Sequence, residues 1–399
     1  MRKPRAARTL AMSAALFSAA AIIIPIARAQ GDHGHQQTDA ANVGTAAQQA
    51  GHSLARLVHP QSSGGVRPGA PARITPHGAP LAPSSSQPAA GTRRHVLFGG
   101  TVPLVPEQPK VGHLGIVRTY YTLGQTFGGR TAAKVMGHGS TMLISLDARP
   151  RRGPSYASIA AGKHDREIRA FMTQVERAAV HYRIPAVYFS FEHEANSPRK
   201  RRLGTPAQFI AAWRHMHHLA ASAHLNWNTG GRLHWVLILE RMAYFTRSER
   251  PRWSLPMGFA SSYYAGSGYV DGVGADGYNS GSCGKPKPAG WLQPGHRVTA
   301  PHHIFNPLLT FAQKHGHMPA FIAEWASIRY ENPRVRPRYI HSMQEYVMAH
   351  PSIKVASYWD SRGPGARGFG GPHPSACSFS VNNDPRSLAA LGNMNHVLP

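Results

Sequence analysis

The chain has 399 residues, and its 44 lysines and arginines against 18 aspartates and glutamates give a formal net charge of +26. This charge favours attraction to polyanions such as acidic glycans or cell-wall polymers, although an arginine-rich proteome or an acidic habitat explains it more simply. No nucleic-acid-binding motif accompanies the charge, so a specific nucleic-acid partner is not expected. The two cysteines, Cys283 and Cys377, form no CxxC pair, and neither a metal nor a cofactor is expected.

The first 29 residues have the three parts of a secretory signal peptide. Residues 1–11 carry four basic side chains and no acidic one, residues 12–26 are almost entirely apolar, and Ala27, Arg28 and Ala29 form an A-x-A cleavage pattern. The apolar run is shorter than the roughly 20 residues that a membrane-spanning helix needs, which disfavours an uncleaved anchor. We therefore expect a secreted protein that is either released or retained at the cell wall or in the periplasm.

Residues 30–93 consist mainly of glycine, alanine, proline, serine, glutamine and histidine. A segment with so few large apolar side chains cannot bury enough surface to offset its ordering entropy, so we predict a disordered low-complexity linker here. Residues 94–399 mix apolar and polar side chains. Their length, about 300 residues, fits one large α/β domain better than two small ones.

Strand and helix patterns alternate through this domain. Strands are predicted at 96–98, 115–121, 140–146, 186–191, 233–239, 269–275, 320–323 and 353–358, and helices at 165–182, 206–225, 301–315, 336–348 and 384–394. Strands separated by helices pair in parallel, and eight of them predict a closed (β/α)8 barrel. The alternative is an open doubly wound sheet, but no glycine-rich phosphate loop follows an early strand.

In such a barrel the functional side chains lie at the C-terminal ends of the strands. The predicted ends carry acids, aromatic residues, a histidine and an arginine: Arg118, Tyr120, Asp147, Glu192, His193, Glu194, Glu240, Asp276, Tyr278, Glu324 and Trp359. Cleavage of a glycosidic bond needs two carboxyl groups. Glu194 and Glu324 end the fourth and seventh strands, which lie nearly opposite each other. Either glutamate alone is as easily a capping or ion-paired carboxylate, but both at these two ends indicate a catalytic pair.

Several of these segments resemble, in the same order, those of glycoside hydrolase family 26, the β-mannanase-type group of the clan A barrels. The run from Phe191 to Asn196, FEHEAN, resembles the strand-four signature, with a histidine directly before the acid/base glutamate and an asparagine two places after it. Similar segments are found at 161–168, 212–215, 263–279, 321–324 and 358–359. The resemblance extends from about residue 115 to the end of the chain.

This resemblance implies a retaining glycoside hydrolase that acts on β-mannan or a related β-linked polysaccharide. Glu194 would be the acid/base and Glu324 the nucleophile. His193 would orient Glu194 or contact the sugar, Tyr278 would hydrogen-bond the nucleophile, and Trp359 would form the floor beneath the sugar ring. We expect Asn196, Arg118 and Tyr120 to complete the substrate-binding set, and the protein to be a monomer. The alternative for His193 is a buried histidine bonded to the backbone, and for Trp359 simple packing.

The sequence also departs from the family. Mannanase-type members place a tryptophan shortly after the acid/base, whereas the loop at 196–203 is basic and free of aromatic residues. They also carry a histidine near the end of strand three, where Asp147 and Arg149 stand here. The catalytic pair is therefore better supported than mannan specificity, and the run from Arg199 to Arg202 could select an acidic glycan, although a charge run is usually a solvated loop.

Two other functions remain compatible with the sequence. One is a non-catalytic glycan-binding or cell-wall-associated protein on an inherited glycosidase barrel, although such a protein would be expected to lack a catalytic carboxyl. The other is a surface protein that binds polyanions through its basic charge. A disulfide between Cys283 and Cys377 is expected in an oxidising compartment, joining the loops after the sixth and eighth strands.

Overall fold

The computed structural model describes residues 96–148, 153–249, 258–279, 298–330, 332–361 and 378–398. Eight parallel strands form a closed barrel in sequence order, with β8 paired to β1. The strands are β1 (Leu97–Thr101), β2 (Ile116–Thr122), β3 (Thr141–Asp147), β4 (Val187–Phe191), β5 (Leu233–Glu240), β6 (Gly272–Asn279), β7 (Ala320–Ser327) and β8 (Ile353–Tyr358). The predicted (β/α)8 barrel is confirmed. The predicted signal peptide and linker lie outside the described residues.

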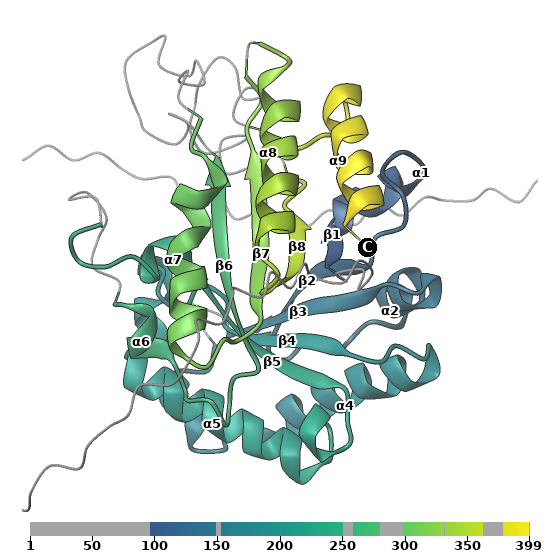
Figure 1. Ribbon diagram of the computed structural model, residues 1–399. Helices are drawn as coiled ribbons and strands as arrows, with labels where there is room; N and C mark the ends of the chain where they lie inside the picture. Colours follow the sequence, from purple (N-terminus) through teal and green to yellow (C-terminus); the bar gives the residue numbers. More distant parts are fainter. Residues whose placement is uncertain are drawn as a thin grey trace, which may run out of the picture. The chain divides into compact units, whose positions relative to one another are not determined.

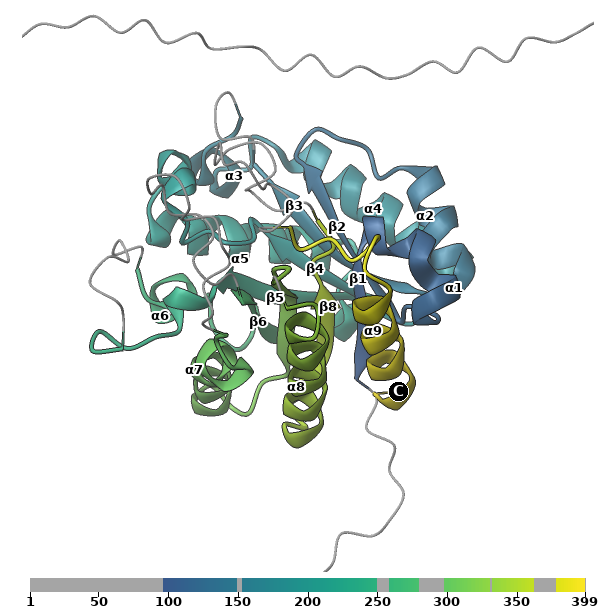
Figure 2. The same cartoon turned by 90° about the horizontal axis from the view of Figure 1, so that it is seen from above.

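Helices surround the strands, as Figures 1 and 2 show. They are α1 (Gln108–Val111), α2 (Gly129–Val135), α3 (Tyr156–Ala160), α4 (Asp165–His181), α5 (Pro206–Ser222), α6 (Ala260–Tyr263), α7 (Pro301–Lys314), α8 (Val335–Ala349) and α9 (Pro385–Val397). Short 3₁₀ helices are η1 (Val102–Glu107), η2 (Met136–His138), η3 (Pro198–Leu203), η4 (Trp227–Thr229) and η5 (Arg241–Ala243). In the part of the chain that the structure describes, no helix combines the length and apolar character needed to cross a membrane.

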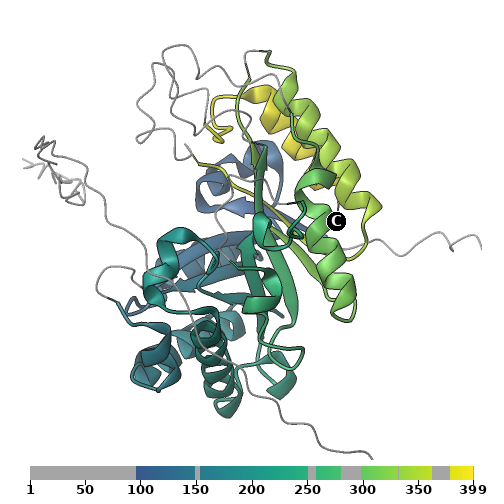
Figure 3. The same cartoon turned by 90° about the vertical axis from the view of Figure 1, so that its left-hand side faces the viewer.

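Local sequence explains where the main helices begin. At α5, Thr205 and Gln208 form a reciprocal capping box and Pro206 occupies the first turn, where a missing N–H costs nothing. The predicted helices at 165–182, 206–225, 301–315, 336–348 and 384–394 correspond to α4, α5, α7, α8 and α9, with bounds that differ by at most three residues. Helices α8 and α9 pack side by side in Figures 1 and 3, joined by the ion pair of Arg336 with Asp384.

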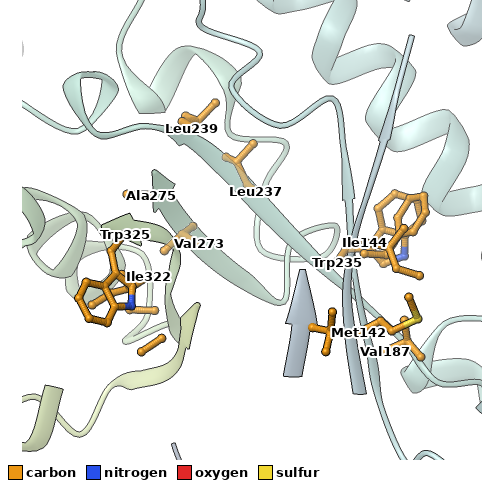
Figure 4. Packing of buried hydrophobic residues seen from close by; sticks show 14 of the residues in the cluster. Met142, Ile144, Val187, Trp235, Leu237, Leu239, Val273, Ala275, Ile322 and Trp325 are labelled. Carbon is orange, nitrogen blue, oxygen red and sulfur yellow. The ribbon is translucent and has the colours of Figure 1, made fainter. Parts of the chain in front are cut away.

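Apolar side chains fill two layers. The larger cluster lies between the barrel wall and the helices and includes Trp213 of α5 against Trp235 of β5. Figure 4 shows part of it, with Trp235 and Trp325 among its largest side chains. A smaller cluster consists of alternate strand residues: Ile116, Leu143, Val236, Ile238, Phe321, Ala323 and Val355. Alternate strand residues point into a barrel, so this cluster fills its lower interior and leaves the C-terminal ends of the strands for polar side chains.

The sixth strand differs from the expectation, since β6 covers Gly272–Asn279 rather than 269–275. Glycine lowers the strand propensity of a segment. For this reason the sequence pattern predicts the strand with the wrong bounds. In the barrel, these glycines allow close packing, because a Cβ on Gly272 would come within 2.5 Å of Phe321 and one on Gly277 within 2.4 Å of Ile304. Asp276 and Tyr278 therefore belong to the strand itself.

A β-bulge in β7 changes which of its side chains face the barrel interior. Ala275 pairs with Ile322, but the next residue, Asp276, pairs with Glu324, so Ala323 is an extra residue in β7. Regular alternation after Phe321 would turn Trp325 inward and Glu324 outward. The bulge reverses this order, and Glu324 faces the barrel mouth while Trp325 packs among the outer apolar residues.

Candidate active site

The site is centred on the carboxylate of Glu324, which is 3% exposed at the C-terminal half of β7. The hydroxyl of Tyr120 donates a hydrogen bond to its Oε1 at 2.5 Å, and the hydroxyl of Tyr278 donates to Oε2. Burial raises the pKa of both phenols, so each stays protonated and able to donate. These donors fix both carboxylate oxygens in the barrel mouth.

A buried arginine lies beneath this carboxylate. Arg118 of β2 is fully buried, and its Nη2 lies 3.6 Å from Glu324 Oε1. Its Nη1 donates to the Ser145 hydroxyl at 2.8 Å, and its guanidinium lies 4.5 Å from the ring centre of Tyr120. The arginine therefore supplies positive charge to Glu324 and supports one of its hydroxyl donors.

Glu194 follows β4 on the other side of the mouth and is partly buried. Burial, with the negative charges of Glu324 and Glu240, raises the pKa of Glu194 to about 8, although Lys200 and Arg118 oppose the shift. At neutral pH this carboxyl therefore carries a proton. Its backbone has a positive φ of 53°, and its N–H donates to the carbonyl of Ile238 on β5 at 2.9 Å.

The segment before Glu194 is held by a cluster of charged groups. His193 Nδ1 lies 3.1 Å from Asp147 Oδ1, at the end of β3. Lys200 Nζ lies 3.1 Å from Asp147 Oδ2 and 2.7 Å from Glu192 Oε1. Burial acts to raise the pKa of Asp147, but His193 and Lys200 together lower it to about 2. Burial raises the pKa of Glu192 to about 7 despite the opposing charge of Lys200.

Asp276 is a third carboxyl beside the pair. It lies on β6, is 3% exposed, and neither of its oxygens has a hydrogen-bond partner among the described residues. Burial, then Glu324 and Glu194, raise its pKa well above the usual range, which favours the neutral acid, a form that can donate one hydrogen bond. The nearest ligand atoms of His193, Asp276 and Glu324 lie within 4.8 Å of one another. Because hydroxyl donors and Arg118 already engage Glu324, we assign no metal to this group.

Aromatic side chains line the mouth next to the carboxyls. Tyr120 contacts Trp359 edge-on at 5.5 Å and His193 at 5.2 Å between ring centres. A cavity of about 340 Å³ opens beside them, lined by residues from the ends of β1, β2 and β8 that include Arg118, Tyr120, Trp359 and Asp360. A larger cavity of about 980 Å³ lies among α1, α8 and α9, and Glu194, Glu324 and Asp276 line neither of the two cavities.

The structure brings most of the predicted site residues together. Arg118, Tyr120 and Tyr278 contact Glu324, and the expected contact of Tyr278 with the nucleophile candidate is present. Asn196 is buried, and its side-chain oxygen accepts the backbone N–H of Glu240 at 3.0 Å. The predicted disulfide partners, Cys283 and Cys377, lie outside the described residues, as does Arg149.

Three groups were not assigned a role from the sequence. The sequence places Asp147 and Asp276 only as acids at strand ends, because their contacts depend on which side chains face the barrel mouth. Lys200 stands in a basic loop, and no spacing in the sequence distinguishes it from its arginine neighbours.

The fold is similar to that of several solved structures. One is a β-mannanase of glycoside hydrolase family 26 from Bacteroides ovatus, with a TM-score of 0.49 and 12% identity, covering 76% of this chain and 88% of that chain. Another is a glucosidase from Croceicoccus marinus, with a TM-score of 0.50 and 10% identity, covering 76% and 68%. At these identities the likeness concerns the barrel fold alone. No family model and no curated protein matches the chain.

Proposed function

We propose that the protein is an exported, retaining glycoside hydrolase that cleaves a β-linked polysaccharide, β-mannan or a related β-glycan. The observation that carries this proposal is the contrast between two carboxyls at one barrel mouth. Glu324 is fixed by two hydroxyl donors and lies beside Arg118, whereas Glu194 has a pKa of about 8 and carries a proton at neutral pH. One nucleophile and one acid are the two groups that double displacement requires.

In the first step, Glu194 gives its proton to the glycosidic oxygen as the bond from that oxygen to the anomeric carbon breaks. A carboxylate oxygen of Glu324 forms a bond to the same carbon, which leaves a glycosyl-enzyme ester and the released alcohol. In the second step, Glu194 accepts a proton from water while the water oxygen attacks the anomeric carbon. Glu324 then leaves as a carboxylate, and the configuration of the sugar is retained.

The surrounding residues fit this scheme. Tyr278 and Tyr120 hold the Glu324 oxygens, and their hydroxyls are placed to stabilise the carboxylate when it leaves in the second step. Trp359 and Tyr120 offer aromatic faces to a sugar ring, and the adjoining cavity of about 340 Å³ has room for part of a glycan chain. Asp276, as a neutral acid, can donate a hydrogen bond to a sugar hydroxyl.

Mannan is the substrate class that the family resemblance favours, through the FEHEAN segment and the segments that follow it in order. Export rests on the pattern of residues 1–29, and retention at an acidic cell wall on the charge of +26. Selection of an acidic glycan by the exposed arginines of η3 is the alternative specificity.

The test is a reducing-end assay on mannans, mixed-linkage glucans, xylans and acidic exopolysaccharides. Wild-type protein should release reducing ends from one of them, and Glu194→Ala and Glu324→Ala should not. Glu345→Ala, the same change at an exposed position of α8, is the matched control and should keep full activity. If the glutamate double variant still binds the glycan and wild-type protein cleaves none, the protein is a glycan-binding protein and the enzyme proposal is wrong.

A further inference from the structure

We propose that Lys200 is a positioning residue for the acid/base glutamate, because its ammonium group holds Glu192 and His193, the two residues directly before Glu194. This inference rests on the proposed function of Glu194. The loop at 196–203 has the composition of a solvated basic segment. The proposal assigns a buried structural role to one of its residues.

The ammonium group of Lys200 meets three oxygen atoms. Nζ lies 2.7 Å from Glu192 Oε1, 3.1 Å from Asp147 Oδ2 and 2.7 Å from the carbonyl oxygen of His193. An ammonium carries three N–H donors; it donates hydrogen bonds to Asp147 Oδ2 and to the His193 carbonyl, and it forms an ion pair with Glu192 Oε1. The partners come from β3 and from the two residues directly before Glu194, and Lys200 therefore ties the end of β3 to the catalytic segment.

The clamped segment needs such support because its backbone is strained. Glu192 has φ of 50° and Glu194 has φ of 53°, a left-handed conformation that is unfavourable for residues other than glycine. Because the residues on both sides of His193 are left-handed, the side chains of residues 192–194 point in directions that neither a strand nor a helix allows. The contacts of Lys200 with Glu192 and with the His193 carbonyl hold this conformation at its centre.

Lys200 differs from its basic neighbours in burial. Its side chain is 12% exposed, whereas Arg199 and Arg202 of the same short helix are exposed. A buried ammonium is costly unless it is paired, and here it meets one fully buried carboxylate and one partly buried one. An arginine at this place would spread its donors over a planar fork and could not meet three oxygens from one atom.

The position of Lys200 has an electrostatic consequence at Glu194. Its positive charge favours the ionised carboxyl and so lowers the pKa of Glu194, with Arg118 acting in the same direction. The groups that face Glu194 from the surrounding elements are Glu324 and Asp276, Glu240, Arg118, Tyr278 and Lys200. Removing Lys200 should therefore raise the pKa of Glu194 further and misplace its carboxyl at the same time.

The experiment compares Lys200→Met and Lys200→Arg with Lys134→Met, the same substitution at an exposed position of α2. Lys200→Met should lower kcat on the order of 10²-fold, because small displacements of a catalytic group have effects of that size. Its KM should change much less, and the alkaline limb of its pH profile should move to higher pH. Lys200→Arg keeps the charge, so its alkaline limb should stay in place while kcat falls. Lys134→Met should match wild type.

A carboxyl ¹³C NMR titration of Glu194 separates this inference from the proposed function, because it needs no substrate. The Glu194 titration should move to higher pH in Lys200→Met and remain unchanged in Lys134→Met. Folded Lys200→Met protein with wild-type kcat and an unmoved titration would overturn the inference. If Lys200→Met does not fold, wild-type kcat in Lys200→Arg would overturn it. If wild-type protein cleaves no glycan, the enzyme proposal fails, while the titration still decides whether Lys200 acts on Glu194.

Discussion

Asp276 of β6 is the register partner of Glu324 of β7, and the bulge at Ala323 creates this pairing. Without the extra residue, Glu324 would face the helices and Trp325 the barrel mouth. The bulge therefore places two carboxyls side by side above Arg118, which accounts for the raised pKa of Asp276 once burial is included. It also brings Tyr278, two residues along β6, within hydrogen-bond distance of Glu324.

The contact between Tyr278 and Glu324 gives the first prediction. Tyr278→Phe keeps the ring that stacks on Phe379 and removes only the hydroxyl donor. Hydrogen bonds to charged groups contribute about 1.5–3 kcal/mol, so kcat/KM should fall roughly 10–10²-fold. Steady-state kinetics on the substrate found by the glycan screen measure this loss. An unchanged kcat/KM in folded protein would show that the hydroxyl does not act on Glu324 during turnover.

The barrel and the positions of its strands could be predicted from the sequence because apolar periodicity reports burial directly. Because functional side chains lie at the C-terminal ends of barrel strands, Glu194 and Glu324 could then be selected from a chain of 399 residues. The start of β6 was misplaced by three residues because Gly272 and Gly274 lack strand propensity. These glycines allow Phe321 to pack closely against the strand. This is a tertiary contact, which a local sequence pattern does not show.

The clamp at Lys200 could not be predicted for a similar reason. Its role depends on backbone angles at Glu192 and Glu194 that no local composition requires, and on the direction in which one lysine of η3 points. The bulge at Ala323 could not be predicted either, because the sequence predicts a regular strand at 320–323 with Glu324 at its end, and no residue there marks an extra position.

The second prediction concerns pH. Catalysis needs Glu194 protonated, so kcat/KM should fall as the pH rises through about 8, the pKa of that carboxyl. The negative charge of Glu240 is one cause of the raised pKa, and Glu240→Gln should therefore move the alkaline limb to lower pH. Glu345→Gln on the exposed face of α8 is the control and should leave the profile in place. A shift to higher pH in Glu240→Gln would contradict the assignment of Glu194 as the acid.

The third prediction is the disulfide between Cys283 and Cys377, both of which lie outside the described residues. A crosslink between positions so far apart in sequence should stabilise the fold by about 2–4 kcal/mol. Mass spectrometry of the protein isolated from an oxidising compartment, with and without reduction, should show one bond and no free thiol. Two free thiols would show that the disulfide prediction is wrong. The proposal for the catalytic pair would not be affected.

The fourth prediction separates the roles of the two glutamates. Glu194→Ala should lose about 10²–10⁴-fold on polysaccharide, where the leaving group needs a proton. It should keep a substantial first step on an activated aryl glycoside, and added azide should restore turnover by attacking the glycosyl-enzyme. Glu324→Ala should be inactive on both substrates, because no covalent intermediate can form. Circular dichroism must first show that both variants fold, and aryl-glycoside turnover by Glu324→Ala rather than Glu194→Ala would reverse the assignment.

The most direct test of the central claim is to trap the intermediate. A 2-deoxy-2-fluoro glycoside of the sugar identified by the screen, with an activated leaving group, should inactivate wild-type protein. Peptide mass spectrometry should then find one fluoroglycosyl group, attached to Glu324, and no label on the Glu324→Ala variant. A label on another residue, or active protein that inverts the anomeric configuration and takes no label, would contradict a double displacement through Glu324.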